Sequence, residues 1–330
     1  QFIVGAGYRL VDAEMDKSIL IRYPYGTGET TQLFSSFVQD KIQLVPNELY
    51  LTLGSKFEYN TYTDFEWQPN ARIAWIPDGK QTIWGAVTRA VRTPSIIERN
   101  LTQVVAATPA KFIAIEVNPK LQSEELIAYE IGYRNQPTTN LSFDATAFIN
   151  KYDNLRTLES AAGLPIDADI LGVASLIPRN FGERTTVGFE LASNYEVNKD
   201  WLLSANYSFL DMDMATTPGS TDTSATSEDR KSPNHMINLR SHYAFNDQWE
   251  MDNYLSFVSQ IKGSTGDSDL NIPSYYRFDA KLTWKPSEGV ETSLVGQNLL
   301  DDKHQEFGSS LYSVPYQIPR SVFGKVTLRF

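Results

Sequence analysis

The chain has 330 residues, a formal net charge of −11, no cysteine and a negative mean hydropathy. An acidic chain without clustered Lys and Arg is poorly suited to nucleic acid, so we expect no nucleic-acid partner. No segment approaches the roughly 18 apolar residues of a membrane helix, which excludes a helical membrane protein. Aromatic residues make up 12 % of the chain. A β-barrel fits these values, because only every second residue of its strands faces lipid.

The amino-terminal segment enters directly into an alternating stretch at residues 1–10, without an initiating Met, a basic region or an apolar core of a signal peptide. We therefore expect the start to be cut or processed. Alternation of apolar and polar residues, with turns at Pro, Gly, Asn and Asp, predicts about fourteen strands along the chain. Their expected ranges are 1–10, 31–45, 48–60, 66–77, 80–91, 122–135, 140–152, 183–197, 200–212, 234–245, 248–261, 273–285, 290–300 and 318–330.

The connections between these strands form two classes that alternate strictly. The short class comprises 46–47, 77–79, 135–139, 198–200, 246–248 and 286–289. The other class, mostly long and polar, comprises 11–30, 61–65, 92–121, 153–182, 213–233, 262–272 and 301–317. Bacterial barrels have short periplasmic turns and longer extracellular loops. The order predicts an all-β, transmembrane, antiparallel up-and-down β-barrel.

The predicted strands separate apolar side chains from charged ones, in a pattern that repeats through the chain. In the segment 276–285 one face carries Tyr276, Phe278, Ala280, Leu282 and Trp284, and the other carries Arg277, Asp279, Lys281 and Lys285. In the last strand the lipid face would carry Val326, Leu328 and Phe330, and the lumen face Lys325, Thr327 and Arg329. A Lys or Arg facing lipid at mid-membrane costs about 2–4 kcal/mol, which explains the separation.

Aromatic residues occur beside the short turns. Trp75, Trp201, Trp249 and Trp284, together with Phe245 and Tyr195, predict an aromatic girdle at the periplasmic interface. The alternative is that they are ordinary core aromatics.

No group of residues indicates catalysis or a metal. The three histidines, His235, His242 and His304, are not at metal-ligand spacing, and there is no cysteine to join them. We expect no enzyme, no cofactor and no zinc or redox metal. The acidic residues of the loops are interpreted as solvated surface, with a cation site as the alternative.

Several short motifs follow in a particular order. Arg92-Thr93-Pro94-Ser95 is followed by Glu98-Arg99, then by Asn118-Pro119-Lys120-Leu121 with Glu124-Glu125, and by the segment from Tyr129 to Tyr133. Gly188-Phe189-Glu190, the segment 297–303, Pro319-Arg320 and the closing segment 324–330 come later. In this order, over about residues 70–330, they resemble the carboxyl-terminal part of the barrel of the TonB-dependent outer-membrane receptors. The chain departs from that pattern at His304, where Tyr is usual.

The resemblance implies a plugged barrel of about 22 strands, of which about fourteen are present. Residues 1–330 would then be the carboxyl-terminal portion of the barrel domain, with the plug domain and the early strands upstream of Gln1. It also implies the outer membrane of a Gram-negative bacterium, contact with lipid and lipopolysaccharide, and coupling to the TonB complex through the missing amino-terminal part. Gly324, Val326, Leu328 and Phe330 would form the assembly signal.

The function that the resemblance implies is energy-coupled import of a scarce nutrient. The substrate that we expect is a small molecule, a metal chelate and in particular an iron–siderophore complex. If the chelate is anionic, residues of the long connections are candidates to bind it: Arg92, Arg99, Lys111, Arg179, Tyr23 and Tyr25. Solvated loop charges or lipopolysaccharide contacts are the alternative roles. The alternative functions are a stand-alone passive channel of fourteen strands and a surface adhesin or phage receptor.

Overall fold

The structure of the chain, a computed structural model, describes residues 1–18, 20–107, 112–161, 173–222, 231–262, 271–307 and 316–329. Almost all regular structure among them is β-strand, and the one helix there is α1 (Ile96–Asn100). Lys111 and Phe330, which were predicted to have roles, lie outside the described residues.

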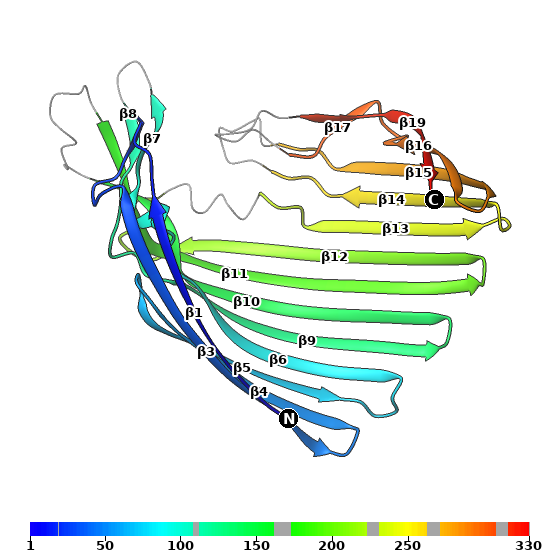
Figure 1. Cartoon of the computed structure of the whole chain (residues 1–330), viewed down its shortest axis with the longest axis horizontal. Helices are drawn as coiled ribbons and strands as arrows, with labels where there is room; N and C mark the ends of the chain where they lie inside the picture. The colour runs from blue at the N-terminus through cyan, green and yellow to red at the C-terminus, as the bar shows by residue number, and fades with distance from the viewer. Residues whose placement is uncertain are drawn as a thin grey trace.

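Fourteen long strands follow one another as antiparallel neighbours of one sheet (Figure 1). They are β1 (Phe2–Glu14), β3 (Gly28–Val45), β4 (Leu49–Asn60), β5 (Asp64–Trp75), β6 (Gln81–Arg92), β9 (Glu124–Thr138), β10 (Leu141–Ser160), β11 (Val173–Asn198), β12 (Trp201–Thr216), β13 (His235–Ala244), β14 (Trp249–Val258), β15 (Tyr275–Ser287), β16 (Val290–Gln297) and β19 (Ser321–Leu328). The predicted all-β antiparallel fold and its succession of strands are confirmed. Alternation predicted them well because each strand of the membrane-facing band presents one apolar and one polar face.

Parts of the predicted loops contain further elements, which the sequence analysis missed. These are β2 (Ile21–Arg22), β7 (Thr102–Ala107), β8 (Phe112–Ile115), β17 (Lys303–Gln305), β18 (Gln317–Pro319) and the helix α1. β2 pairs with β7, β7 with β8, and β17 with β18. These elements are too short to show the two-residue alternation of apolar and polar side chains, so the sequence predicted loops at these positions.

The hairpin of β10 and β11 corrects the expected strand ends. The alternating pattern placed these ends at 152 and 183, but β10 continues to Ser160 and β11 already begins at Val173. The pairing register shifts between Tyr152 and Thr157, and Asn154 there has a φ of 58°. Beyond the apolar band neither face of a hairpin must be apolar, so the sequence loses its alternation while the backbone pairing continues.

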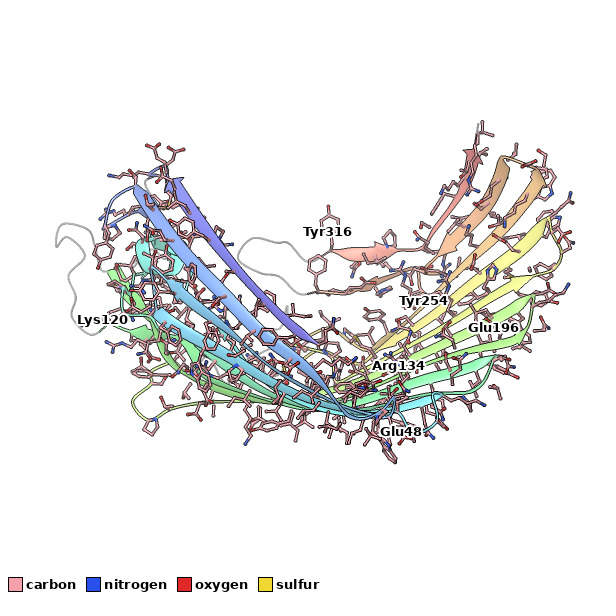
Figure 2. The ribbon with its side chains drawn as sticks, turned by 60° about the horizontal axis from the view of Figure 1, so that its bottom comes forward. Glu48, Lys120, Arg134, Glu196, Tyr254 and Tyr316 are labelled. Atoms are coloured by element: carbon pink, nitrogen blue, oxygen red, sulfur yellow. The ribbon has the colours of Figure 1, made fainter. Side chains whose placement is uncertain are left out.

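The sheet is strongly curved and has two free edges in the described residues. β1 pairs with β3 alone, and β19 pairs with β16 alone. Figure 2 shows the result as a trough, with β1 and β3 on one side and the last strands on the other. The side chain of Tyr254, from β14, lies within the trough.

The two faces of the sheet differ in polarity as predicted. Leu294 is 57 % exposed and pairs with Gly324, whereas its neighbour Ser293, which points to the opposite face, is 3 % exposed. On the same face as Ser293, Lys281 lies 3.7 Å from Glu291. Apolar side chains therefore cover the outside of the trough and charged side chains line its inside.

Aromatic side chains beside the short turns lie on the outside of the trough. The rings of Trp249 and Trp284 stack at 5.8 Å, and Trp201 packs edge-on against Tyr243 at 5.9 Å. Trp75 is 46 % exposed, so these residues do not form an ordinary buried core. The position matches that expected for an interfacial girdle.

The last strand displays its predicted faces. Val326 and Leu328 are exposed on the outside and Gly324 shares their face, while Thr327 pairs with Glu291 of the inner face. The described residues of the closing segment thus have the predicted orientation, and their role in assembly stays a prediction.

Candidate functional site

The long connections of the sheet gather at one rim, opposite the short turns (Figure 1). At this rim, α1 follows β6 and packs beside the turn between β4 and β5. The sequence favours a helix there because Ser95 is a good N-cap and Glu98 occupies the third helical position. The Ser95 Oγ accepts a hydrogen bond from the Glu98 N–H at 3.3 Å, and the Ser95 N–H donates to Glu98 Oε2 at 2.8 Å. This capping box fixes the short helix at the end of β6.

Arg92, the first of the predicted ligand contacts, is held between two carboxylates. Its Nε and Nη2 donate to Glu124 at 2.7 and 2.8 Å, and its Nη1 and Nη2 donate to Glu98 at 3.2 and 3.0 Å. Arg156 Nη1 lies 3.8 Å from Glu98 Oε1. The network joins α1 to the end of β6 and the start of β9. The structural role of Arg92 is therefore to hold these three elements together.

The electrostatics of Glu98 follow from this network. Burial raises the pKa of Glu98, but the hydrogen bonds from Arg92 and from the Ser95 N–H together outweigh burial and hold that pKa below its ordinary range. Glu98 is therefore ionised at neutral pH, and its carboxylate accepts the hydrogen bonds that hold Arg92 and the start of α1 together.

Arg99, the second predicted contact, lies against Tyr62 in the turn between β4 and β5. Its guanidinium carbon is 5.0 Å from the centre of the Tyr62 ring, and Nη1 donates to the Tyr62 carbonyl. Burial lowers the pKa of Arg99. Burial and the nearby Glu29 carboxylate raise the pKa of Tyr62, whose hydroxyl is buried.

Asn100, at the end of α1, connects the helix to the loop that carries the two predicted tyrosines. Its side chain is buried and donates to the Gly26 carbonyl at 3.0 Å and to Glu29 Oε2 at 3.1 Å, and it accepts from the Tyr25 N–H at 3.3 Å. The backbone at Tyr25 is thereby fixed while the ring stays 62 % exposed. Tyr23 lies two residues away and is half-buried.

A pocket of about 350 Å³ opens beside these residues. Its lining includes Arg9 from β1, Asn60 and Tyr62 from the end of β4 and the turn after it, and the segment 93–96 at the start of α1. The pocket combines a guanidinium, a phenol and small polar groups, which is a suitable set for a polar anionic ligand. Three residues of the motif at 92–95, namely Thr93, Pro94 and Ser95, thus line the pocket.

Two other predicted contacts lie elsewhere or cannot be placed. Arg179 is exposed in β11, 5.9 Å from the Phe181 ring, and its carbonyl accepts from Thr157 at 3.3 Å. Lys111 falls outside the described residues. The structure therefore brings Arg92, Arg99 and the Tyr25 backbone together around α1, whereas Arg179 lies on β11; none of these four residues lines the pocket itself.

The sequence analysis missed Arg9, Tyr62 and Asn100. The sequence could have indicated Arg9, because the alternation in residues 2–10 puts it on the polar face of its strand. No sequence pattern indicated Tyr62 or Asn100, since each acquires its role through contacts with residues far along the chain.

A second polar cluster lies where β16 ends and the β17–β18 hairpin begins. Asn298 is fully buried with a φ of 52°, its backbone N–H donates to Asp279 at 2.9 Å, and its Nδ2 donates to the Ile318 carbonyl at 3.0 Å. His304 Nδ1 lies 3.1 Å from Asn298 Oδ1, and its ring stacks on Tyr275 at 4.3 Å. His304 stands at the position where the receptor family usually has Tyr. Like a Tyr it places an aromatic ring there, and the ring also hydrogen-bonds to Asn298.

The described residues contain neither a group of metal ligands nor a membrane-spanning helix. Within the described ranges no three His, Asp or Glu side chains come together as metal ligands. No helix there is long and apolar enough to cross a membrane.

Comparisons with known proteins agree with this architecture. The family model described as "TonB dependent receptor-like, beta-barrel" matches residues 2–299. An iron-regulated outer membrane virulence protein of Vibrio cholerae is 21 % identical over 282 residues, which is 83 % of this chain and 42 % of that protein. A probable TonB-dependent siderophore receptor, PiuA of Acinetobacter baumannii, is 25 % identical over 196 residues, covering 57 % of this chain and 24 % of that protein.

Solved structures show the same fold. The ferric enterobactin receptor PfeA of Pseudomonas aeruginosa superposes with a TM-score of 0.73 at 16 % identity, over 100 % of this chain and 51 % of that one. The siderophore receptor PirA of Acinetobacter baumannii gives a TM-score of 0.72 at 14 % identity, over 100 % of this chain and 55 % of that one. The chain spans less than half the length of the matched curated relatives and about half of the matched structures. With the family match extending over most of its length, the chain belongs to the TonB-dependent receptor β-barrel family.

Proposed function

We propose that the chain forms the carboxyl-terminal part of the barrel of an outer-membrane receptor that captures and imports an iron–siderophore complex. The remaining strands, a plug domain and the TonB contact would be supplied by an amino-terminal part of the receptor. Membrane lipid would cover the apolar outside, and lipopolysaccharide would contact the rim of the long loops. The names of the relatives, which include siderophore receptors, support this substrate class.

The observation that carries the proposal is the pocket at the loop rim. It opens on the polar inside of the sheet, and its wall includes Arg9, which has no carboxylate partner within the described ranges. A cation without a partner at the mouth of a low-dielectric channel attracts an anionic chelate. We assign Arg9, Arg99, Tyr25 and Tyr62 to ligand contact, with Arg179 and Lys111 as contacts from other loops.

Arg92 receives a different role in this proposal. Because both of its donor edges are already engaged by Glu98 and Glu124, it has little capacity left for a ligand. We assign it to positioning α1, so that Arg99 and the segment 93–96 face the pocket.

Binding of ferric siderophores to the full-length receptor tests the proposal. We expect the double variant Arg9→Ala/Arg99→Ala to bind an anionic ferric catecholate about tenfold or more weakly, since hydrogen bonds to charged groups contribute about 1.5–3 kcal/mol each. Arg320→Ala is the control, because Arg320 precedes β19, pairs with Asp302 at 3.1 Å and does not line the pocket. Equal affinity in the double variant and the control would overturn the assignment of the pocket.

Uptake by whole cells tests whether import of the chelate depends on energy. We expect transport of the labelled chelate to stop when the proton-motive force is collapsed, while surface binding remains. Transport that continues without it would favour a passive channel. Binding without any transport would favour an adhesin or phage-receptor role.

A further inference from the structure

His304, in the second polar cluster, is buried between the barrel wall and the β17–β18 hairpin. It is 8 % exposed, it pairs with Ile318 of β18, and its ring stacks on Tyr275 of β15. The hairpin is part of the connection between β16 and β19, the last long connection of the loop rim. The His304 ring therefore lies at the contact between this connection and the wall.

Each nitrogen of this ring faces a hydrogen-bond acceptor. Nδ1 lies 3.1 Å from Asn298 Oδ1, and Nε2 lies 3.0 Å from Glu306 Oε1. The Asn298 amide is not free to turn a donor toward the ring, because its Nδ2 already donates to the Ile318 carbonyl at 3.0 Å. An ionised carboxylate only accepts. The two contacts therefore need two protons, whereas a neutral imidazole beside a carboxylate supplies one.

The charged groups of β15 place the second proton on His304. Arg277 Nη1 lies 3.5 Å from Glu306 Oε1, and its Nη2 lies 2.9 Å from Asp279 Oδ2. A guanidinium at this distance favours the ionised form of Glu306, so the proton between Glu306 and His304 belongs to the ring. Arg277 and a protonated His304 then balance the carboxylates of Asp279 and Glu306. A neutral ring would leave one negative charge in excess.

The other elements around the ring do not change this balance. The end of β16 contributes the neutral Asn298, and β18 contributes Ile318. Among the described residues of the hairpin and its base, the charged ones besides Glu306 are Asp301, Asp302, Lys303 and Arg320. Asp302 pairs with Arg320 at 3.1 Å and its side chain is 92 % exposed. Lys303 is exposed, and as the neighbour of His304 in β17 it points to the opposite face.

We propose that His304 is a proton-dependent latch for the β17–β18 hairpin. With a proton on each ring nitrogen, it binds Asn298 of the wall and orients Glu306 toward Arg277 of the wall. Loss of one proton leaves two acceptors facing each other in a site closed to water, and the hairpin loosens. Folding favours the protonated ring, so the latch holds at lower pH and is lost as the pH rises. The inference does not depend on the ligand that the receptor binds.

Hydrogen exchange of the full-length receptor in lipid vesicles, measured at a series of pH values, tests the proposal. Results are compared as protection factors, which correct for the intrinsic effect of pH on exchange. From about pH 5.5 to about pH 9, across the range in which an imidazole titrates, we expect protection of residues 303–305 and 317–318 to fall. The fall should be about tenfold or more, the factor that corresponds to one hydrogen bond to a charged group. Residues 280–285 of β15 are the internal reference and should stay constant.

Two variants should abolish this response in different ways. His304→Tyr keeps an aromatic ring against Tyr275, but its hydroxyl does not titrate in this range. Glu306→Gln keeps the size of the side chain and can donate its amide N–H to an unprotonated ring nitrogen, so it accommodates a neutral His304. We expect hairpin protection in both variants to show no such fall with pH.

His242→Gln is the matched control, because His242 lies near the short turn at 246–248 and its Nδ1 is 3.0 Å from Asp252 Oδ1. This variant should keep the full response. Hairpin protection that does not change with pH in the natural protein, or that falls equally in Glu306→Gln, would overturn the proposal. Since Glu306→Gln leaves the His304 ring in place, it decides the question even where His304→Tyr loosens the hairpin at every pH.

Discussion

Gly132 leaves room for an indole ring on the inner face of the sheet. A Cβ at this position would lie 2.3 Å from the Trp84 ring, a distance that no packed structure allows. Trp84 in turn lies under the Arg72 guanidinium, whose central carbon is 4.2 Å from the centre of the ring. The absence of a side chain at one position of β9 therefore fixes the position of a charged group on β5, two strands away.

We predict that Gly132→Ala destabilises the folded barrel by about 1–3 kcal/mol, the usual cost of overpacking. Gly85→Ala is the control, since the nearest atom to its Cβ would be 3.6 Å away. The urea midpoint of unfolding in lipid vesicles, followed by tryptophan fluorescence, measures both. Equal midpoints for the two variants would contradict the predicted crowding.

Glu98 gives the rim a pH dependence whose sign follows from its lowered pKa. A carboxyl group with a lower pKa in the folded state stabilises that state above its ordinary pKa, and this contribution is lost as the pH falls through the folded pKa. We expect α1 and its flanks to lose protection in hydrogen exchange as the pH falls below about 4.

The variant Glu98→Gln checks the origin of this effect. It keeps the shape of the side chain but removes the charge that Arg92 and the capping box hold. We expect the segment 92–104 to exchange faster at neutral pH and to change less on acidification. A pH response equal to that of the natural protein would assign the effect to other carboxylates.

The candidate site was predictable from sequence only in part. The motif at 92–99 was expected to end a strand at the rim, and β6 does end at Arg92, followed by α1 from Ile96. Its role in ligand contact stays a prediction. The partners of Arg92 lie 6 and 32 residues away, so the sequence could not show that its charge is already compensated. Arg9 is brought to the pocket through the pairing of β1 with β3, which alternation alone does not specify.

At the scale of elements, alternation predicted the membrane-facing strands and failed beyond them. The interior of β15 was foreseen because lipid on one side and the lumen on the other impose a period of two. The extension of β10 to Ser160 was not, since solvent on both faces imposes none. The buried Asn298, with a left-handed backbone, also gave no periodic signal, although it fixes the β17–β18 hairpin to the barrel wall.

We predict that Asn298→Ala loosens this hairpin. The change removes the side-chain hydrogen bond to Ile318 and the contact with His304, and it places Ala where Asn tolerates a positive φ better. A buried hydrogen bond lost in this way costs about 1–3 kcal/mol. Hydrogen exchange at residues 303–305 and 317–319 should rise, whereas Leu300→Ala, at an exposed position nearby, should leave it unchanged. Unchanged exchange in both variants would show that the hairpin is held by other contacts.

At the scale of the whole molecule, the structure separates two regions of the inner face. The loop rim carries the polar pocket, and the end with the short turns carries a second hollow, whose lining includes Lys41, Arg72 and Arg134. Strand order and the alternation of turn lengths predicted the two rims, but neither hollow. Whether the sheet closes depends on the meeting of β1 and β19, about which local sequence patterns carry no information.

The two free edges lead to a prediction about the chain studied in isolation. A strand edge exposed to lipid leaves backbone groups without hydrogen bonds, and each such group costs several kcal/mol. Because β1 and β19 each have one neighbour within the described ranges, we expect the 330-residue chain alone not to form a uniform pore. Planar-bilayer recordings of the refolded chain should show no single, reproducible unit conductance. A discrete conductance, together with a folded band that changes mobility on heating, would mean that the fourteen strands close by themselves, and the passive-channel alternative would then replace the receptor proposed above.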